Sequence, residues 1–206
     1  MKKIIVFVVA LAACVAAFAQ TPEEIISRME AEMSAHEAEG VVMTMDVKIP
    51  LVGTMSTSSW SLGNKLRLEG KVSGILIVTW TDGTTQWTYN SHDNEIEITA
   101  DKGKAAEDSG DAGMFSGIAD GYSVTLESED DTAWYLSCRK SKSNKDKDAP
   151  KSISLSVYKG SYYPKSLSTK ASGVTFTLRD VSFGVSPEQV TFNPADYPGA
   201  KIKDKR

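Results

Sequence analysis

The feature that most constrains this chain is a change in the spacing of its apolar residues at Gly40. Before Gly40 they recur at helical spacing, and after it apolar and polar residues alternate, beginning with Val41, Met43, Met45 and Val47. Alternation with a period of two predicts strands with one buried face. A regular series of short strands separated by turns is typical of a sandwich or barrel and argues against alternating βαβ units. The sequence therefore predicts a mainly β fold.

Alternating runs continue through most of the chain. Residues 74–80 are nearly continuously apolar, which indicates a strand buried on both faces. Asp82-Gly83 and the stretch 92–94 predict tight turns. Later alternating runs are Tyr122/Val124/Leu126, Trp134/Leu136/Cys138, Ile153/Leu155/Val157 and Val174/Phe176/Leu178. From all these runs we expect about ten or eleven strands in a single domain.

A single amphipathic helix is predicted ahead of the strands, over residues 22–38. Thr21 has the side chain to cap its first turn, Pro22 suits the first position, and Glu24 completes a capping box. Four apolar side chains share one face at helical spacing. They are Ile25, Ile26, Met29 and Met33. The helix therefore has one apolar face and a polar back.

Residues 1–19 have the composition of a secretory signal peptide. Two lysines form a positive n-region, an apolar stretch follows, and Ala17-Phe18-Ala19 fits the small-x-small cleavage rule. The apolar stretch is too short for a stable membrane span. We therefore expect cleavage after Ala19, which leaves residues 20–206 as one exported domain.

The two cysteines have different expected roles. Leu11-Ala12-Ala13-Cys14 resembles a bacterial lipobox, in which Cys14 is lipidated and kept as an anchor, and this interpretation competes with simple cleavage. Cys138 would be the only cysteine of a chain that begins at Gln20, so we expect no internal disulfide. Because it alternates with Trp134 and Leu136, Cys138 is predicted to be a buried apolar residue.

The sequence contains no recognisable catalytic, metal-binding or nucleic-acid-binding motif. Its two histidines, His36 and His92, have no partner at metal-ligand spacing, and its net charge of −4 comes without a basic cluster. No nucleophile elbow or phosphate-binding loop occurs. Glu129-Asp130-Asp131 is interpreted as a hairpin tip, with calcium binding as a weaker alternative. We expect a protein that is not an enzyme, holds no cofactor or metal and binds no nucleic acid.

What the sequence offers instead is a set of apolar and polarizable side chains. Four tryptophans are spread along the strands, and methionines are concentrated in the first half and at Met114, after the polar, glycine-rich residues 100–113. Methionine is typical of surfaces that repack around variable guests, although each residue taken alone also suits an ordinary core. Combined with an amphipathic helix over a curved sheet, these side chains predict a ligand cavity suited to acyl chains.

Several segments resemble one known family. In residues 79–90, Asp82-Gly83 is followed by Trp87 and Tyr89, which resembles the Asp-Gly-x-x-x-Trp-x-Tyr hairpin of the outer-membrane lipoprotein carrier protein (LolA) family. The exported N-terminus, the lone helix and a strand bearing Trp60 match upstream, and residues 162–167 and the ending 190–199 match downstream. The resemblance covers most of the mature chain, and the order of the motifs is more specific than any one of them.

The resemblance implies a fold, a function and partners. The fold is an unclosed antiparallel β-barrel of about eleven strands, with the N-terminal helix and a short helical loop as a lid over its concave face. The function is that of a periplasmic carrier or chaperone, which binds acyl chains of lipoproteins and escorts them to the outer membrane. The partners are the lipoproteins themselves, an inner-membrane release complex and an outer-membrane acceptor, and the carrier acts as a monomer.

One departure from the family affects the lid. Well-known members carry an Arg-Pro pair shortly after the strand tryptophan, and this arginine latches the lid. Here that place reads Ser61-Leu62-Gly63-Asn64-Lys65. Lys65 and Arg67 are candidate substitutes, but lysine lacks the planar fork of arginine. The alternative function is therefore a periplasmic or membrane-tethered lipid-binding or sensing module without transfer activity.

The candidate acyl-chain site combines the helix with apolar side chains of strands and loop. From the lid, Ile25, Ile26, Met29 and Met33 are predicted to face the cavity. Candidates for its lining are Met43, Met45, Trp60, Leu66, Leu68, Trp87, Tyr89, Ile96, Met114 and Phe115. Periodicity alone does not tell which face of the sheet is concave, so we expect about half of these lining residues to lie on the other face.

Overall fold

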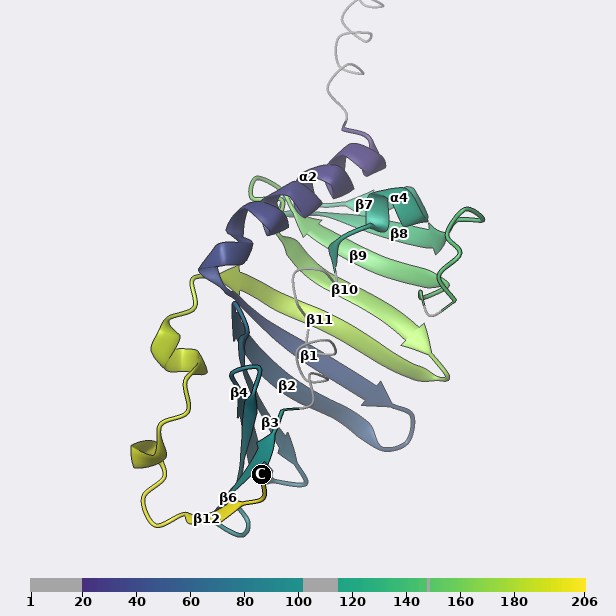
Figure 1. Ribbon diagram of the computed structural model, residues 1–206. Coiled ribbons are helices and arrows are strands. Elements are labelled where there is room, and N and C mark those ends of the chain that lie inside the picture. The colour runs from purple at the N-terminus through teal and green to yellow at the C-terminus, as the bar shows by residue number, and fades with distance from the viewer. Residues whose placement is uncertain (1–19, 102–114, 148) are drawn as a thin grey trace, which may run out of the picture.

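The computed structural model describes residues 20–101, 115–147 and 149–206. The proposed signal segment, with Cys14, and the site candidate Met114 lie outside these residues. The described chain begins with a helix and continues as a large β-sheet with short helical turns (Figure 1).

Helix α2 (Pro22–His36) begins where the sequence predicts it. The Thr21 hydroxyl accepts a hydrogen bond from the Glu24 N–H at 3.2 Å, and the Glu24 carboxylate accepts one from the Thr21 N–H at 3.0 Å. This reciprocal pair is a capping box. The 3-10 turn η1 (Glu37–Glu39) extends the helix as far as Gly40. The predicted helix is confirmed.

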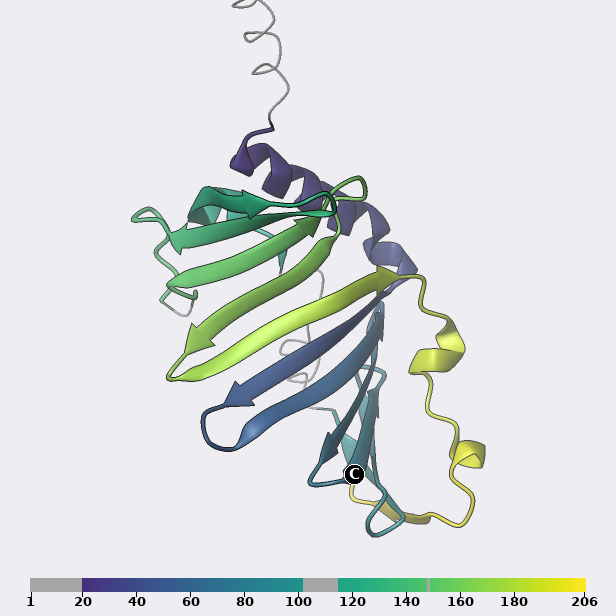
Figure 2. The ribbon, with the colours of Figure 1, turned by 180° about the vertical axis from the view of Figure 1, so that it is seen from behind.

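The strands form a single sheet of twelve, in the order β12-β6-β5-β4-β3-β2-β1-β11-β10-β9-β8-β7. The bounds of the elements are β1 (Val41–Ile49), β2 (Gly53–Leu62), β3 (Lys65–Val72), β4 (Ile75–Thr81), β5 (Thr85–Asn90), β6 (Glu95–Ala100), α4 (Ile118–Gly121), β7 (Tyr122–Glu129), β8 (Ala133–Lys140), β9 (Ser152–Tyr158), β10 (Pro164–Ala171), β11 (Val174–Phe183), η3 (Pro187–Val190), η4 (Pro194–Asp196) and β12 (Lys201–Asp204). Strands β1 to β11 pair antiparallel, and β12 pairs parallel with β6. The sheet curves without closing, so the predicted unclosed, mainly antiparallel architecture is confirmed, with β12 as an added edge strand (Figures 1 and 2).

The strand registers define two faces of this sheet, because residues directly opposite each other on paired strands point to the same face. Met43 of β1 pairs with Ser59 of β2, and Ser59 pairs with Leu68 of β3. We call the face that carries these residues the inner face. Consecutive partners on the opposite, outer face of β2 to β5 are Trp60, Arg67, Trp80 and Trp87.

The main core lies between α2 and the inner face of β7 to β11 and β1 (Figure 1). Its members include Ile25, Ile26, Met29, Met33, Val41, Met43, Phe115, Ile118, Leu136, Cys138, Leu155, Val157, Leu167 and Leu178. Cys138 is 0% exposed, as the alternation predicts. One apolar stripe of a helix laid on one face of a sheet is a common two-layer arrangement, and it hides most of the apolar side chains of this half.

The C-terminal segment between β11 and β12, residues 184–200, covers the outer face of the other half of the sheet, and we call it the C-terminal strap. It runs beside β2 to β6 before it adds β12 (Figures 1 and 2). Phe192 stacks on Trp87 with 5.5 Å between ring centroids, and Tyr197 packs on Tyr89 at 4.4 Å. Both rings of the segment also meet Trp80 edge to face. Ring pairs at such distances add to simple burial, so the segment is held as a strap over this face.

Gly40 joins the helix to the sheet at a point where no side chain fits. Its φ is +79°, and a Cβ there would lie 2.6 Å from the Ser61 carbonyl oxygen and 2.7 Å from the Val185 Cβ. We expect Gly40→Ala to lower the free energy of unfolding by more than the roughly 1–3 kcal/mol that such a backbone conformation costs by itself. Urea denaturation measures this.

Gly63→Ala is the matched control, because Gly63 also has a positive φ, +58°, but nothing lies within 4 Å of an added Cβ. Its expected cost is the backbone term alone, about 1–2 kcal/mol. Equal losses in the two variants would show that the close approach of β2 and Val185 to Gly40 does not matter.

The Cys138 thiol is predicted to be inert in the folded protein. Burial raises its pKa to about 11, so at pH 8 it is protonated as well as inaccessible. In protein lacking residues 1–19, a thiol reagent at pH 8 should modify Cys138 only as fast as the protein unfolds, and at once in denaturant. Rapid modification of the folded protein would contradict this placement.

Candidate functional site

The apolar face of α2 is completely buried against the sheet. Ile25, Ile26 and Met29 are 0% exposed and Met33 is 2% exposed. Phe115, at 1%, and Met43, at 2%, belong to the same cluster. In the described residues the space beneath the helix is therefore filled by the protein's own side chains, and any guest there must displace or lift α2.

The structure brings together only part of the predicted site. Met43, Met45, Leu66 and Leu68 lie on the inner face, by their registers with β2 and β4. Phe115 lies with them in the core under α2.

The other lining candidates point the opposite way. Trp60, Trp87, Tyr89 and Ile96 lie on the outer face, where Trp87 pairs with Trp80 and Tyr89 with Ile96. The aromatic hairpin therefore faces the C-terminal strap and not the helix. This separation has a simple cause: on a strand, neighbouring positions alternate between faces, and the sequence pattern did not show which parity faces α2.

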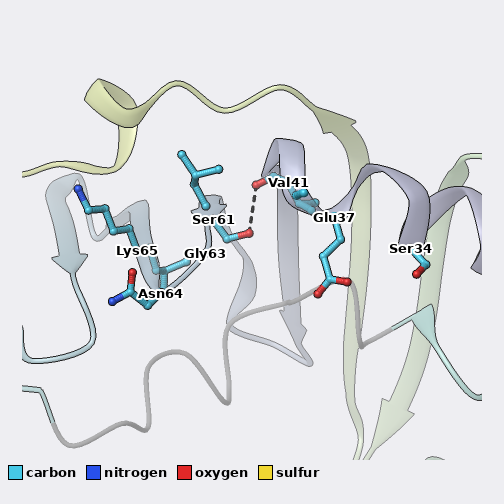
Figure 3. A pocket seen from close by; sticks show the side chains of 10 residues that line it. Ser34, Glu37, Val41, Ser61, Gly63, Asn64 and Lys65 are labelled. Carbon is cyan, nitrogen blue, oxygen red and sulfur yellow. Dashed lines mark hydrogen bonds between the residues drawn. The ribbon is translucent and has the colours of Figure 1, made fainter.

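An open pocket lies at the C-terminal end of α2. Its volume is about 560 Å³, within the usual range for small-molecule sites. It is lined by Ser34, Glu37, Ala38, Val41, Ser61, Leu62, Gly63, Asn64, Lys65 and Leu66. Figure 3 shows Ser34 and Glu37 on the helix side and Asn64 and Lys65 on the hairpin side, with Val41 and Ser61 between them. The lining thus has polar groups on both sides and also includes the apolar side chains of Val41 and Leu66.

Sequence reasoning missed this pocket, although one signal pointed to it. Its hairpin wall is the stretch 61–65, the same segment that departs from the family pattern. No periodicity marks such a space, because it arises where the end of a helix meets a hairpin from a different part of the chain.

Beyond β4 the inner face becomes polar. Thr88 of β5 pairs with Glu97 of β6, and Asn90 pairs with Glu95. These four side chains, with Ile77 and Asp93, line a second pocket of about 300 Å³. The apolar part of the inner face is therefore confined to the helix-covered half and the pocket beside it.

Few polar contacts hold α2 in place. The Glu30 carboxylate accepts hydrogen bonds from the N–H groups of Ile118 at 2.7 Å and Ala119 at 3.1 Å, so it caps α4 from the neighbouring helix. The Tyr162 hydroxyl accepts hydrogen bonds from Arg28 at 3.1 Å and from Gln20 at 2.6 Å. These contacts join α2 to α4 and to the β9–β10 turn.

Neither expected substitute for the latching arginine reaches α2. The Lys65 ammonium donates a hydrogen bond to the Thr191 hydroxyl at 3.0 Å, on the C-terminal strap. The Arg67 guanidinium lies 4.8 Å from the Trp60 ring and 5.8 Å from the Trp80 ring, on the outer face. The idea that Lys65 or Arg67 latches the lid is wrong. The hydrogen bonds of Glu30 and Arg28 join α2 to α4 and to Tyr162 instead.

The described part of the acidic cluster Glu129-Asp130-Asp131 lies at a turn and is not part of a metal-ligand group. Within residues 20–101, 115–147 and 149–206, no group of three metal-ligating side chains occurs. Hydrogen bonds from the Thr132 and Tyr135 side chains, followed by those from backbone N–H groups, hold the pKa of Asp130 far below its usual value. Asp130 thus stabilises the turn between β7 and β8, which supports the interpretation of the acidic cluster as a hairpin tip. The part of the chain that the structure describes also has no helix long and apolar enough to span a membrane.

Comparisons with known proteins give a likeness in fold. No protein-family profile and no curated protein matches the sequence. Among solved structures, an uncharacterized conserved protein from Thermus thermophilus shows 16% identity over 90% of this chain and 100% of its own, with a TM-score of 0.48. The lipoprotein LppX from Mycobacterium tuberculosis shows 10% identity over 81% and 98%, with a TM-score of 0.48.

One further solved structure comes from the LolA superfamily. A LolA superfamily protein from Nitrosomonas europaea is 12% identical over 86% of this chain and 100% of its own, with a TM-score of 0.34. At these identities and scores the likeness does not assign a function.

Removing the carboxylate of Glu30 should loosen α2 without unfolding the sheet. Glu30→Ala leaves the Ile118 and Ala119 N–H groups without their acceptor, which costs roughly 1–3 kcal/mol. We expect faster amide hydrogen exchange in α2 and α4 and little change in β9 and β10. Glu32→Ala is the control, since the salt bridge of Glu32 is a 3.8 Å contact with His36 on the same helix. Equal exchange in both variants would show that Glu30 does not hold the helix.

Proposed function

We propose that this protein binds acyl chains on the apolar inner face of its sheet, with α2 as a movable cover, and that it carries lipoproteins across the periplasm to the outer membrane. One observation carries the proposal. An apolar helix face lies on the inner face of an unclosed sheet, few polar contacts hold it, and an open pocket of about 560 Å³ adjoins it.

The energies permit both uptake and release. Burying about ten methylenes of an acyl chain is worth about 8 kcal/mol. Exposing the four buried side chains of α2 would cost roughly 6–12 kcal/mol by the same measure. Because these terms are similar, a chain can enter through the pocket and replace part of the helix contact, yet leave again when an acceptor offers another apolar surface.

The side chains at the helix contact suit such exchange. Met29 and Met33 of α2 meet Met43 in the same buried cluster. Methionine is unbranched and polarizable, so it fills irregular space and repacks around guests better than branched side chains do. The inner face can therefore accept an acyl chain without a cavity shaped for one particular chain.

The resemblance to the LolA family supports the finer parts of the proposal. These are lipoproteins as cargo, an inner-membrane release complex and an outer-membrane acceptor as partners, and action as a monomer in the periplasm. A lipid anchor loses about 0.8 kcal/mol for each methylene it exposes, so it cannot cross an aqueous space without a carrier.

A second function, lipid binding or sensing without transfer, is favoured by one specific feature. Where the family has an arginine latch, α2 of this chain is held by two other contacts. Its Glu30 accepts a hydrogen bond from the Ile118 N–H of α4, and its Arg28 donates one to the Tyr162 hydroxyl. A lid held by different contacts opens under different conditions. Retention of Cys14 as a lipid anchor would also favour this function, because a tethered protein does not shuttle.

Filling the pocket tests acyl binding without touching the core. Ser61→Phe places a ring in the pocket from the inner face of β2, and we expect the affinity for a fluorescent long-chain fatty acid to fall about tenfold, a loss of roughly 1.4 kcal/mol. The free energy of unfolding should change little. Ser58→Phe is the matched control on the same strand, because Ser58 lies on the outer face, opposite Glu69.

The two variants give a clear decision. Equal affinities for Ser61→Phe, Ser58→Phe and the unmodified protein would reject the pocket as the entry for acyl chains.

Native mass spectrometry of protein isolated from periplasm, followed by a test of cargo transfer to outer membranes, distinguishes a carrier from a protein that only binds lipid. Bound acylated lipoprotein that moves to the membrane supports the carrier, and bound free lipid without transfer supports the alternative.

A further inference from the structure

Three neighbouring hairpin ends lie at one end of the sheet, between the β5–β6 turn and the β8–β9 loop, and we call them the hairpin edge. They are residues 47–55 of β1–β2, 71–76 of β3–β4 and 169–176 of β10–β11. These hairpins are neighbours because β1 pairs with β11 and β2 pairs with β3. In both views their tips lie away from α2 (Figures 1 and 2). The proposed acyl site makes no use of these tips.

The hairpin edge exposes large apolar side chains at its tips. Leu51 is 108% exposed, Val52 is 74% exposed and Val72 is 53% exposed. Leu51 also has a φ of +66°, which is uncommon for a residue other than glycine. Two consecutive apolar side chains at the point of a hairpin are costly in water, and such exposure marks a surface that meets an apolar partner.

The charges of the hairpin edge all have one sign. Each hairpin end carries one lysine, Lys48, Lys71 or Lys170, and the three stretches contain no carboxylate. The whole chain nevertheless has more acidic than basic residues, 27 against 23. Within the described residues, none of the salt bridges involves these lysines. The hairpin edge is therefore a locally basic patch, bordered by Asp93 of the β5–β6 turn, and such a patch on an acidic protein is complementary to an anionic surface.

The registers arrange the apolar and basic groups on opposite sides of the edge. Lys48 and Lys170 both pair with Thr175, so they lie in one row across three strands, about 10 Å apart on the outer face. Val47 pairs with Met55 and with Phe176 on the inner face, behind the tip of Leu51 and Val52. The edge therefore has an apolar tip and inner side and a basic outer side.

The geometry points to a membrane-docking function for the hairpin edge: Leu51 and Val52 enter the acyl region of an anionic phospholipid surface while Lys48, Lys71 and Lys170 contact its headgroups. A lipid surface fits better than a protein groove because Leu51 and Val52 project together from one hairpin tip into solvent, with lysines on the neighbouring hairpin ends. This is how short apolar segments with basic neighbours lie in a membrane interface. The docking is independent of acyl binding beneath α2.

Vesicle sedimentation tests the docking. Protein lacking residues 1–19 is mixed with vesicles of equal parts phosphatidylcholine and phosphatidylglycerol, at low and at raised salt. We expect binding that weakens with salt, because exposed charges are screened. The double variant L51D/V52D should bind at least about tenfold more weakly. K48Q/K71Q/K170Q should lose about fivefold for each lysine, which corresponds to ~1 kcal/mol per residue at an anionic surface.

Two control variants separate specific docking from general effects. K201Q/K203Q/K205Q changes the net charge by the same amount at β12 and should bind normally. I202D changes an apolar side chain of β12 that is 58% exposed and should also bind normally. All variants should keep their affinity for the fluorescent fatty acid, so a failure of docking and a failure of acyl binding can be told apart.

Several outcomes would overturn the proposal. The first is no binding to anionic vesicles, and the second is unchanged binding by L51D/V52D. A third is equal loss in the β12 lysine variant. A concentration-dependent dimer that L51D/V52D abolishes, without vesicle binding, would assign the edge to a second copy of the chain. Binding only to vesicles that contain membrane protein would assign it to a protein partner.

Discussion

The contact between α2 and the inner face of the sheet is the interaction on which the rest of the structure depends. An open sheet with one strongly apolar face cannot remain exposed to water, and closing into a complete barrel is one solution. Here a helix covers the apolar face instead, and it buries four of its own side chains against the sheet. The cover is a separate element, joined to the sheet at Gly40 and by the hydrogen bonds of Glu30 and Arg28.

The two faces of the sheet are covered by two different segments. α2 hides the inner face of one half, and the aromatic strap with Phe192 and Tyr197 hides the outer face of the other half. The strap is tied by ring contacts and by β12, so it serves stability. The pocket lies where the cover of the first half ends. The proposed acyl site and the stabilising strap thus lie on different surfaces of one sheet, and the hairpin edge is a third surface.

Much of the fold could be predicted from the sequence, and less of the site. The helix could be predicted from Thr21, Glu24 and the spacing of Ile25 to Met33, because capping and amphipathicity depend on residues close together in the chain. The alternating runs likewise specify strands. The lining of the site could not be predicted in the same way. Whether Met43 and Trp87 lie on the same face depends on the register of all strands from β1 to β5, and no local pattern encodes that register.

The sequence by itself determined the element types, the single amphipathic helix, the buried Cys138 and the mainly β architecture, because each depends on interactions between near neighbours in the chain. Only the tertiary structure decided which face the aromatic hairpin occupies, that Glu30 and Tyr162 hold the helix, and where the pocket opens. The physical reason is distance along the chain: Glu30 meets Ile118 and Arg28 meets Tyr162 only after the sheet has folded, and such contacts leave no periodic trace in the sequence.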